Sequence, residues 1–179
     1  MTYLAVPACG HDVDSMAKQV QAAKQRDAEM VELRLDYLGG LDLDSVGWLV
    51  RPAHGLNLPV IVTCRDISEG GHRNYPPELR LGVLCKALQE GADFVDCEWA
   101  NFQRPEVCKS LSEAIQARPA SRLILSAHDF EKPFTDPDDL INEIRRASPR
   151  AIPKLAYMAN HINDCFAAFD LLSARRADT

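Results

Sequence analysis

The 179-residue sequence lacks several features that would point to common classes of protein. It contains no run of basic residues and carries a net charge of −6, which argues against binding to nucleic acid or to an anionic membrane surface. No apolar stretch approaches the roughly 20 residues of a membrane-spanning helix. The N-terminal residues Met1–Val6 show no basic region ahead of an apolar one, so we expect no signal peptide. A small anionic substrate stays compatible with this charge, because a local cluster of arginines can bind it.

Two cofactor signatures are also missing. The six cysteines form no CxxC pair, which argues against a zinc site, and several lie on apolar faces where cysteine behaves as a small hydrophobe. We therefore expect reduced thiols in a cytoplasmic protein. The segment Pro7–Gly10 follows the first strand-like run without the GxGxxG spacing, which argues against a dinucleotide-binding site.

A rhythm of short apolar runs and longer amphipathic segments does fill the chain. The expected strands are Tyr3–Pro7, Met30–Leu35, Val60–Cys64, Phe94–Glu98, Leu123–Ala127 and Ile152–Tyr157. Helices are expected near 14–28, 42–53, 77–90, 104–117, 136–147 and 160–175. Asp14 and Ser15 are candidate caps for the first helix, and Pro77 and Pro105 suit a first helical turn. Alternating strands and helices predict a parallel sheet in an α/β protein.

Two architectures fit this rhythm, an open doubly wound sheet and a (β/α) barrel. Charged residues recur within or just after several different strands, which favours the barrel, where the active site gathers at the carboxyl ends of the strands. A (β/α)8 TIM barrel needs eight units, however, and the sequence supplies about six. We therefore predict a single barrel domain over residues 1–179 in which strands seven and eight are missing, or whose open edges another chain covers.

Lys154 lies in the apolar strand-like run Ala151–Met158. Burial disfavours an ammonium, so a lysine in such surroundings is expected to have a lowered pKa and to offer a free amine near neutral pH. A free amine attacks carbonyl groups and forms a Schiff base. The alternative is a strand-end lysine whose stem reaches out to water.

Other polar residues interrupt the expected strands. Glu32, Arg34 and Asp36 share one face of the second strand, either as a structural ion-pair network or as substrate-binding groups. Arg65 ends the third strand, and Gly70–Gly71 in the following loop is typical of a mobile lid.

Two further strands add titratable groups. Asp96 and Glu98 share a face of the fourth strand, where a surface position and an inward one are both possible, and His128 ends the fifth strand. A histidine beside a reactive amine can serve as general acid and base, although a loop hydrogen bond is its commoner role. Together these residues predict a lyase or aldolase that acts on an anionic keto compound through an imine.

Four motifs in this order resemble a known family, the type I 3-dehydroquinate dehydratases of the shikimate pathway. They are VELRLDYL, the Arg65 loop with EGG at Glu69–Gly71, SAHDF at Ser126–Phe130 and IPKLAYM at Ile152–Met158. The resemblance implies a (β/α)8 barrel that dehydrates 3-dehydroquinate to 3-dehydroshikimate by syn elimination.

The resemblance also implies residue roles. Lys154 matches the Schiff-base lysine and His128 the proton donor and acceptor, while Glu32, Arg34, Arg65 and Glu69 match substrate-binding residues. It implies no metal or organic cofactor, a homodimer and a small-molecule substrate. The sequence departs from the family by ending at Thr179, before the last two strands. Another class I Schiff-base aldolase, or an inactive truncated barrel that pairs with another chain, stays open as an alternative.

Overall fold

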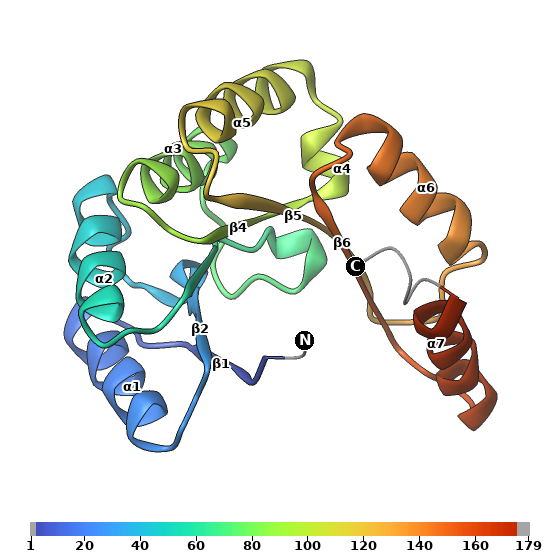
Figure 1. Cartoon of the computed structure of the whole chain (residues 1–179), viewed down its shortest axis with the longest axis horizontal. Coiled ribbons are helices and arrows are strands. Elements are labelled where there is room, and N and C mark those ends of the chain that lie inside the picture. Colours follow the sequence, from blue (N-terminus) through green and yellow to red (C-terminus); the bar gives the residue numbers. More distant parts are fainter. Residues whose placement is uncertain (1–2, 175–179) are drawn as a thin grey trace.

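Six parallel strands form one curled sheet, in a computed structural model that describes residues 3–174. Their spatial order is their order along the chain, and each strand pairs with the next. The strands are β1 (Ala5–Ala8), β2 (Met30–Arg34), β3 (Val60–Thr63), β4 (Phe94–Glu98), β5 (Arg122–Asp129) and β6 (Ile152–Tyr157). Figure 1 shows the helices arranged in an arc outside this sheet.

The helices alternate with the strands as the sequence predicts. The long ones are α1 (Val13–Gln25), α2 (Leu43–Gly55), α3 (Pro77–Gln89), α5 (Pro105–Ala117), α6 (Pro137–Ala147) and α7 (Ile162–Ala174). Three short turns at the carboxyl ends of strands were not predicted: η1 (Leu35–Tyr37), η2 (Ile67–Glu69) and α4 (Trp99–Phe102). These turns place polar side chains at the mouth of the curled sheet, which is where barrel enzymes carry their active sites.

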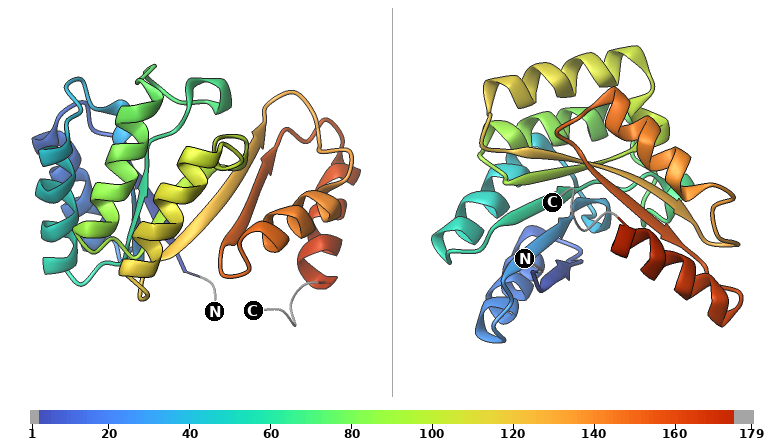
Figure 2. Two further views of the ribbon diagram at one scale, coloured as in Figure 1. Left: turned by 90° about the horizontal axis from the view of Figure 1, so that it is seen from above. Right: turned by 45° about the vertical axis from the view of Figure 1, so that its right-hand side comes forward.

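Sequential strand order with helices on the outer face decides between the two predicted architectures. A doubly wound sheet reverses its strand order and carries helices on both faces, whereas a barrel adds each unit beside the previous one. The fold is therefore a six-unit (β/α) half-barrel, and the views in Figure 2 show its curl and the gap between the first and last strands.

The outer face of the sheet supplies the core. Val31, Leu33 and Leu35 have no exposed surface, as the alternation of the second strand predicts. They belong to one cluster that runs from Ala8 to Ala151 between the sheet and the helices. A fully buried leucine or valine contributes about 1.5–3 kcal/mol relative to an exposed one, so this outer layer carries most of the folding energy.

Two details of the predicted elements need correction. Asp12, and neither Asp14 nor Ser15, caps α1: its carboxylate accepts from the Ser15 amide at 2.7 Å, and the Ser15 hydroxyl lies 3.1 Å from the Asp12 amide. Strand β5 continues to Asp129, two residues beyond the predicted end at Ala127, so His128 lies within the strand. Pro77 and Pro105 do occupy first helical turns, as predicted.

Helix α7 differs from the others because it buries none of its residues. Its side chains Ile162, Phe166, Phe169 and Leu172 are 54–68% exposed and recur at helical spacing. Within the described residues, no helix has the length and apolar character needed to cross a membrane.

Candidate active site

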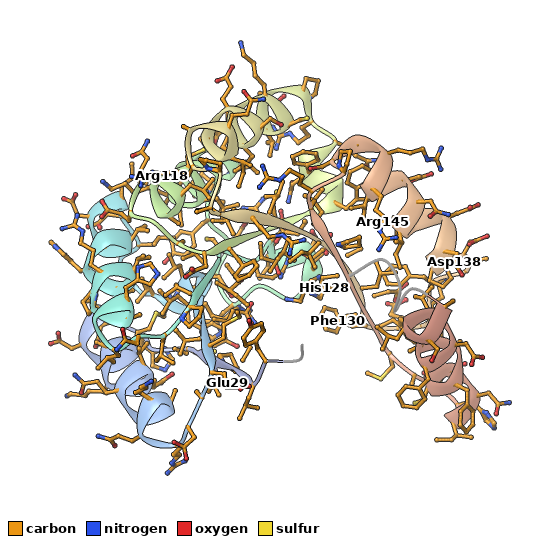
Figure 3. The ribbon with its side chains drawn as sticks, viewed as in Figure 1. Glu29, Arg118, His128, Phe130, Asp138 and Arg145 are labelled. Atoms are coloured by element: carbon orange, nitrogen blue, oxygen red, sulfur yellow. The ribbon has the colours of Figure 1, made fainter. Side chains whose placement is uncertain are left out.

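The register of the strands gathers the predicted site residues on the inner face of the half-barrel. Lys154 pairs with Ser126, which pairs with Glu98, so all three side chains point to the same side of the sheet. The same alternation places His128 and Asp96 on that side. Figure 3 shows His128 and Phe130 on the concave side of the ribbon.

Carboxylates surround the amine of Lys154. Its Nζ lies 2.9 Å from Oδ2 of Asp96 and 3.9 Å from Oε1 of Glu32, and its side chain is 38% exposed. The apolar setting expected from Ile152 and Leu155 is therefore wrong for the amine itself. Strand alternation explains the difference, because neighbours in sequence point to the opposite face and the inner face is polar.

Asp96 joins three inner-face side chains. Its fully buried carboxylate accepts from Ser126 at 2.6 Å and pairs with both Lys154 and Arg65 at 2.9 Å. Burial alone raises the pKa of Asp96, but the charges of Arg65 and Lys154 and the hydrogen bonds from Arg65 and Ser126 outweigh burial, so the net pKa is lowered. The carboxylate is thus a fixed negative charge beside the amine.

Arg65 lies under the mouth of the half-barrel and not in solvent. Its side chain is 4% exposed, and Nη1 donates to Glu98 at 3.0 Å and to Ser126 at 2.6 Å. Burial lowers the pKa of Arg65, whereas the charges of Asp96 and Glu98 raise it, and the net shift is upward. The guanidinium is therefore a permanent cation at the base of the site.

Glu32 and Arg34 reach the mouth from β2. The Arg34 guanidinium donates twice to the buried Asp36 carboxylate, at 2.9 and 2.8 Å, and these hydrogen bonds raise the pKa of Arg34. Glu32 accepts from the Thr63 hydroxyl at 2.7 Å. Both side chains stay about one-fifth exposed, 19% for Glu32 and 20% for Arg34, so a ligand in the mouth could contact them.

His128 and Glu69 form a pair that the sequence did not predict. One Glu69 oxygen lies 3.0 Å from the backbone nitrogen of His128 and 2.9 Å from its Nδ1. A carboxylate at Nδ1 favours the tautomer in which Nδ1 carries the proton and Nε2 is left to exchange protons with a substrate. The side chains are 9% and 14% exposed, so this pair is held largely away from water.

Asp96 and Ser126 are the site residues that sequence reasoning missed. The sequence allows both a surface and an inward position for Asp96 and Glu98, and in the structure both are buried. The available signal was that they share a face in a strand flanked by arginine-, histidine- and lysine-bearing strands. Ser126 gave no signal of its own, since a buried serine becomes a site residue only through its partners Arg65 and Asp96.

This arrangement supports imine and proton-transfer chemistry. An amine, a histidine whose Nδ1 contacts a carboxylate and cationic guanidinium groups lie close together at one end of the sheet. Within residues 3–174, no group of three or more His, Cys, Asp or Glu side chains has the geometry to hold a metal ion.

Comparison with known proteins gives one consistent result. The sequence model of the family described as type I 3-dehydroquinase matches residues 4–179. A 3-dehydroquinate dehydratase from Aquifex aeolicus is 31% identical over 155 residues, and one from Methanocaldococcus jannaschii is 29% identical over 163 residues. The crystal structure of the Aquifex aeolicus enzyme superposes with a TM-score of 0.74 at 28% identity.

The matches cover most of this chain but only part of the relatives. The two relatives match 86% and 89% of this chain and 66% and 70% of their own lengths, and the superposed structure is matched over 91% of this chain and 69% of its own. The chain thus spans about two thirds of the length of the relatives it matches. Because the family match runs through nearly all of it, from residue 4 onward, this chain belongs to the type I 3-dehydroquinase family.

Proposed function

We propose that this protein dehydrates 3-dehydroquinate to 3-dehydroshikimate, the reaction named by the relatives it matches. The observation that carries the proposal is the placement of Lys154 and His128 on adjacent strands of one polar face, with Glu69 of the η2 turn in contact with His128. An imine-forming amine and a proton shuttle are the two groups that such an elimination needs. The substrate is a small hydroxylated keto acid, which the polar mouth of the half-barrel suits.

Lys154 acts as the nucleophile. Its amine adds to the ketone carbon and, after loss of one water, leaves a protonated imine between Nζ and that carbon. The imine nitrogen is protonated, so the Asp96 carboxylate, 2.9 Å from Nζ, can stabilise its positive charge. The same carboxylate holds the lysine on the inner face, since Arg65 and Ser126 anchor it from behind.

His128 moves the proton. The imine acidifies the neighbouring C–H bond, and Nε2 takes that proton while the electron pair enters the ring system as an enamine. The imidazolium then returns a proton to the hydroxyl on the next carbon, which leaves as water. Hydrolysis of the imine releases the unsaturated product and restores the amine. Glu69 stabilises the imidazolium between these steps because its carboxylate contacts Nδ1.

Two cations and one carboxylate of the mouth act on the substrate in this proposal. Arg34 and Glu32 are partly exposed and suit the substrate hydroxyl and carboxyl groups. Arg65 is buried, so it contributes a positive potential and holds Asp96, and substrate contact with its guanidinium stays a prediction. The homodimer expected from the resemblance and the cytoplasmic location expected from the cysteine pattern also stay predictions.

A continuous absorbance assay tests the proposal, because the product contains a carbonyl conjugated to a double bond and the substrate does not. Wild-type protein should convert 3-dehydroquinate, and Lys154→Met should abolish turnover while keeping the apolar stem. Lys109→Met, on the exposed surface of α5, is the matched control and should turn over normally. Normal turnover in Lys154→Met would exclude the imine mechanism.

A class I aldolase shares the imine step, so the assay needs a second arm. An aldolase would cleave a carbon–carbon bond and release an aldehyde, which a dehydrogenase-coupled assay detects. Conversion of 3-dehydroquinate without any aldehyde supports the dehydratase. Aldehyde release from sugar phosphates, with no conversion of 3-dehydroquinate, would support the aldolase.

A further inference from the structure

We propose that Asp66 and Arg80 are positioning residues that fix the His128 tautomer through the loop carrying Glu69. This inference rests on the proposed function, in which His128 is the proton shuttle. Neither Asp66 nor Arg80 is hydrogen-bonded to Lys154 or His128 in the structure. Their effect therefore has to pass through the loop.

Asp66 uses its two carboxylate oxygens for different tasks. Oδ1 accepts from the amide and the hydroxyl of Ser68, at 2.9 and 2.8 Å, and so caps the η2 turn. Oδ2 accepts from Nη2 of Arg80 at 2.5 Å and from Asn101 at 3.3 Å. One side of the carboxylate thus shapes the loop, and the other attaches the loop to helices α3 and α4.

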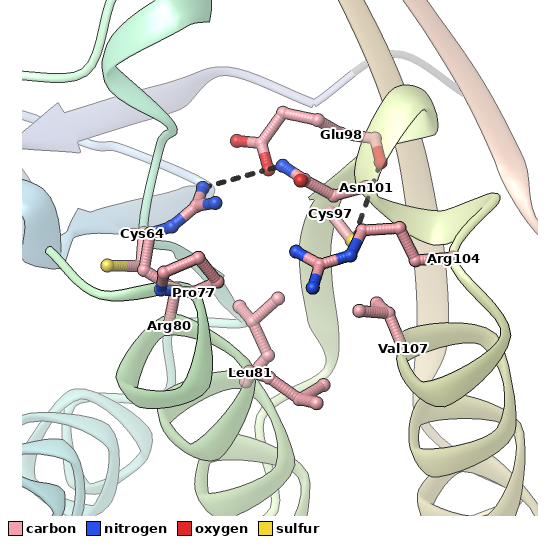
Figure 4. Close-up of a pocket in the computed structure, with 10 residues that line it drawn as sticks. Cys64, Pro77, Arg80, Leu81, Cys97, Glu98, Asn101, Arg104 and Val107 are labelled. Atoms are coloured by element: carbon pink, nitrogen blue, oxygen red, sulfur yellow. Dashed lines mark hydrogen bonds and ion pairs between the residues drawn. The ribbon is translucent and has the colours of Figure 1, made fainter. Parts of the chain in front are cut away.

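Arg80 is a buried charge that contacts neither Lys154 nor His128. Its side chain is 9% exposed, and besides Asp66 it pairs with Glu98 at 3.4 Å. Glu98 in turn accepts from Asn101 at 2.9 Å, and Figure 4 shows Arg80 and Asn101 meeting at this carboxylate. Burying an ion pair costs several kcal/mol of desolvation per ion, and an apolar replacement is often neutral or stabilising. A role in stability alone is therefore a weak explanation for Arg80.

The loop after Asp66 leaves little freedom between the anchor and Glu69. The Asp66 carbonyl accepts from the amides of Glu69 at 3.0 Å and Gly71 at 2.8 Å, which closes the turn on itself. Gly70 ends the turn at φ +82°, a conformation that favours glycine. A Cβ on Gly71 would lie 2.3 Å from the Arg65 carbonyl oxygen, so the chain packs here as closely as glycine allows.

Displacing Asp66 should therefore displace Glu69. Glu69 contacts both the backbone nitrogen and Nδ1 of His128 through one oxygen, at 3.0 and 2.9 Å. A shift of about 1 Å would break the ring contact, because hydrogen bonds weaken steeply beyond about 3.5 Å. His128 would then populate both neutral tautomers, and only one of them leaves Nε2 free to accept a proton.

Asp66→Asn tests this chain of contacts. The amide keeps one oxygen to cap Ser68 but replaces the acceptor for Arg80 with an NH2 group. Asp42→Asn is the matched control, because Asp42 caps α2 by the same contacts to a serine three residues on and lies on the outside of the half-barrel. The readout is the ¹⁵N NMR spectrum of the His128 ring in the free protein, recorded at about pH 8, where imidazole is ordinarily neutral.

Wild-type protein and Asp42→Asn should show the tautomer with the proton on Nδ1, and Asp66→Asn should show a mixture of both. Glu69→Ala should give the same mixture, and adding Asp66→Asn to it should change nothing further, because the two residues act in series. A wild-type spectrum for Asp66→Asn would overturn the proposal. A further change in the double variant would overturn it as well.

A replacement variant and a readout that is independent of turnover keep the experiment interpretable. If Asp66→Asn does not fold, Arg80→Met replaces it: the apolar stem remains but the donors to Asp66 and Glu98 are lost, so the same mixture is expected, and a wild-type tautomer would overturn the proposal. The spectrum needs neither substrate nor turnover, so an inactive wild-type protein would refute the proposed function without touching this inference. If the wild-type protein is active, Asp66→Asn should lower turnover while the Lys154 adduct still forms. The loss of turnover should be smaller than the roughly 10²–10⁴-fold contribution of general acid–base catalysis.

Discussion

Replacing Asp96 with asparagine should strongly destabilise the protein. The substitution preserves shape and a hydrogen-bond acceptor for Ser126 but removes the negative charge that Lys154 and Arg65 share. Both cations touch the same carboxylate oxygen at 2.9 Å, so their nitrogens lie at most about 6 Å apart. Without Asp96 these like charges face each other.

The structure sets the size of the effect. Two unit charges about 6 Å apart repel by roughly 3 kcal/mol at the effective dielectric constant of about 20 that suits protein sites. Glu98 still balances part of the Arg65 charge, and water screens Lys154, whose side chain is 38% exposed. Loss of one partner from a buried ion pair costs about 3–5 kcal/mol. We therefore expect Asp96→Asn to lower the free energy of unfolding by about 3 kcal/mol near neutral pH.

The pKa shift of Asp96 determines how the difference in stability between the two proteins changes with pH. The pKa of Asp96 is lowered in the folded protein, so its stabilisation is complete above the ordinary carboxyl pKa of about 4 and is lost as pH falls through the lower folded value. Urea denaturation of both proteins between about pH 7 and pH 3 measures the difference. The difference in free energy of unfolding between wild type and Asp96→Asn should be constant above about pH 5 and should decrease below about pH 4.

Asp93→Asn is the control for this measurement. Asp93 precedes the same strand, but it pairs with His54 and the Val60 amide at the opposite end of the sheet, and its side chain is 42% exposed. We expect this change to cost less than about 1 kcal/mol. Equal stabilities of Asp96→Asn and wild type near neutral pH would refute the reasoning, as would a gap that does not depend on pH.

Three further predictions follow from single side chains. His128→Ala should lower turnover by about 10²–10⁴-fold while the covalent adduct on Lys154 still forms, and normal turnover in the absorbance assay would remove His128 from the mechanism. Gly70→Ala should cost at least about 1–2 kcal/mol in urea denaturation, because φ is +82° and the new Cβ would lie 2.7 Å from the Phe130 ring; Gly40→Ala, with open space around it, should be close to neutral. Cys64, whose pKa burial raises to about 12, should stay unmodified by iodoacetamide near neutral pH in the folded protein, and peptide mass spectrometry showing rapid labelling would contradict its burial.

The strands and the long helices follow from sequence pattern because their apolar periods are strong. Val31, Leu33 and Leu35 alternate with charged residues, and this alternation correctly assigns one face to the core. The barrel type also follows, since charged residues end several strands. The short turns η1, η2 and α4 could not be predicted, because each depends on contacts with a neighbouring strand or helix and not on a periodic pattern.

The sequence identifies most of the site residues, but it does not show which of them contact one another. Lys154 and His128 stood out as polar residues in apolar strands, but the carboxylate beside Lys154 comes from Asp96, 58 positions earlier in the chain. Only the strand register joins them. The resemblance assigns Glu69 to substrate binding. Its contact with His128 depends on the η2 turn, which the sequence pattern does not predict. Which residues pair across strands depends on contacts between distant parts of the chain, and a single sequence indicates such contacts only weakly.

The most direct test of the central claim is to trap the imine. The protein would be incubated with 3-dehydroquinate and borohydride, which reduces an imine to a stable amine, and then analysed by intact-mass and peptide mass spectrometry. A Schiff base at Lys154 predicts one adduct, mapped to this residue, that is absent in Lys154→Met and present in Lys109→Met. A folded protein that forms no adduct, or an adduct on another lysine, would contradict the imine mechanism at Lys154.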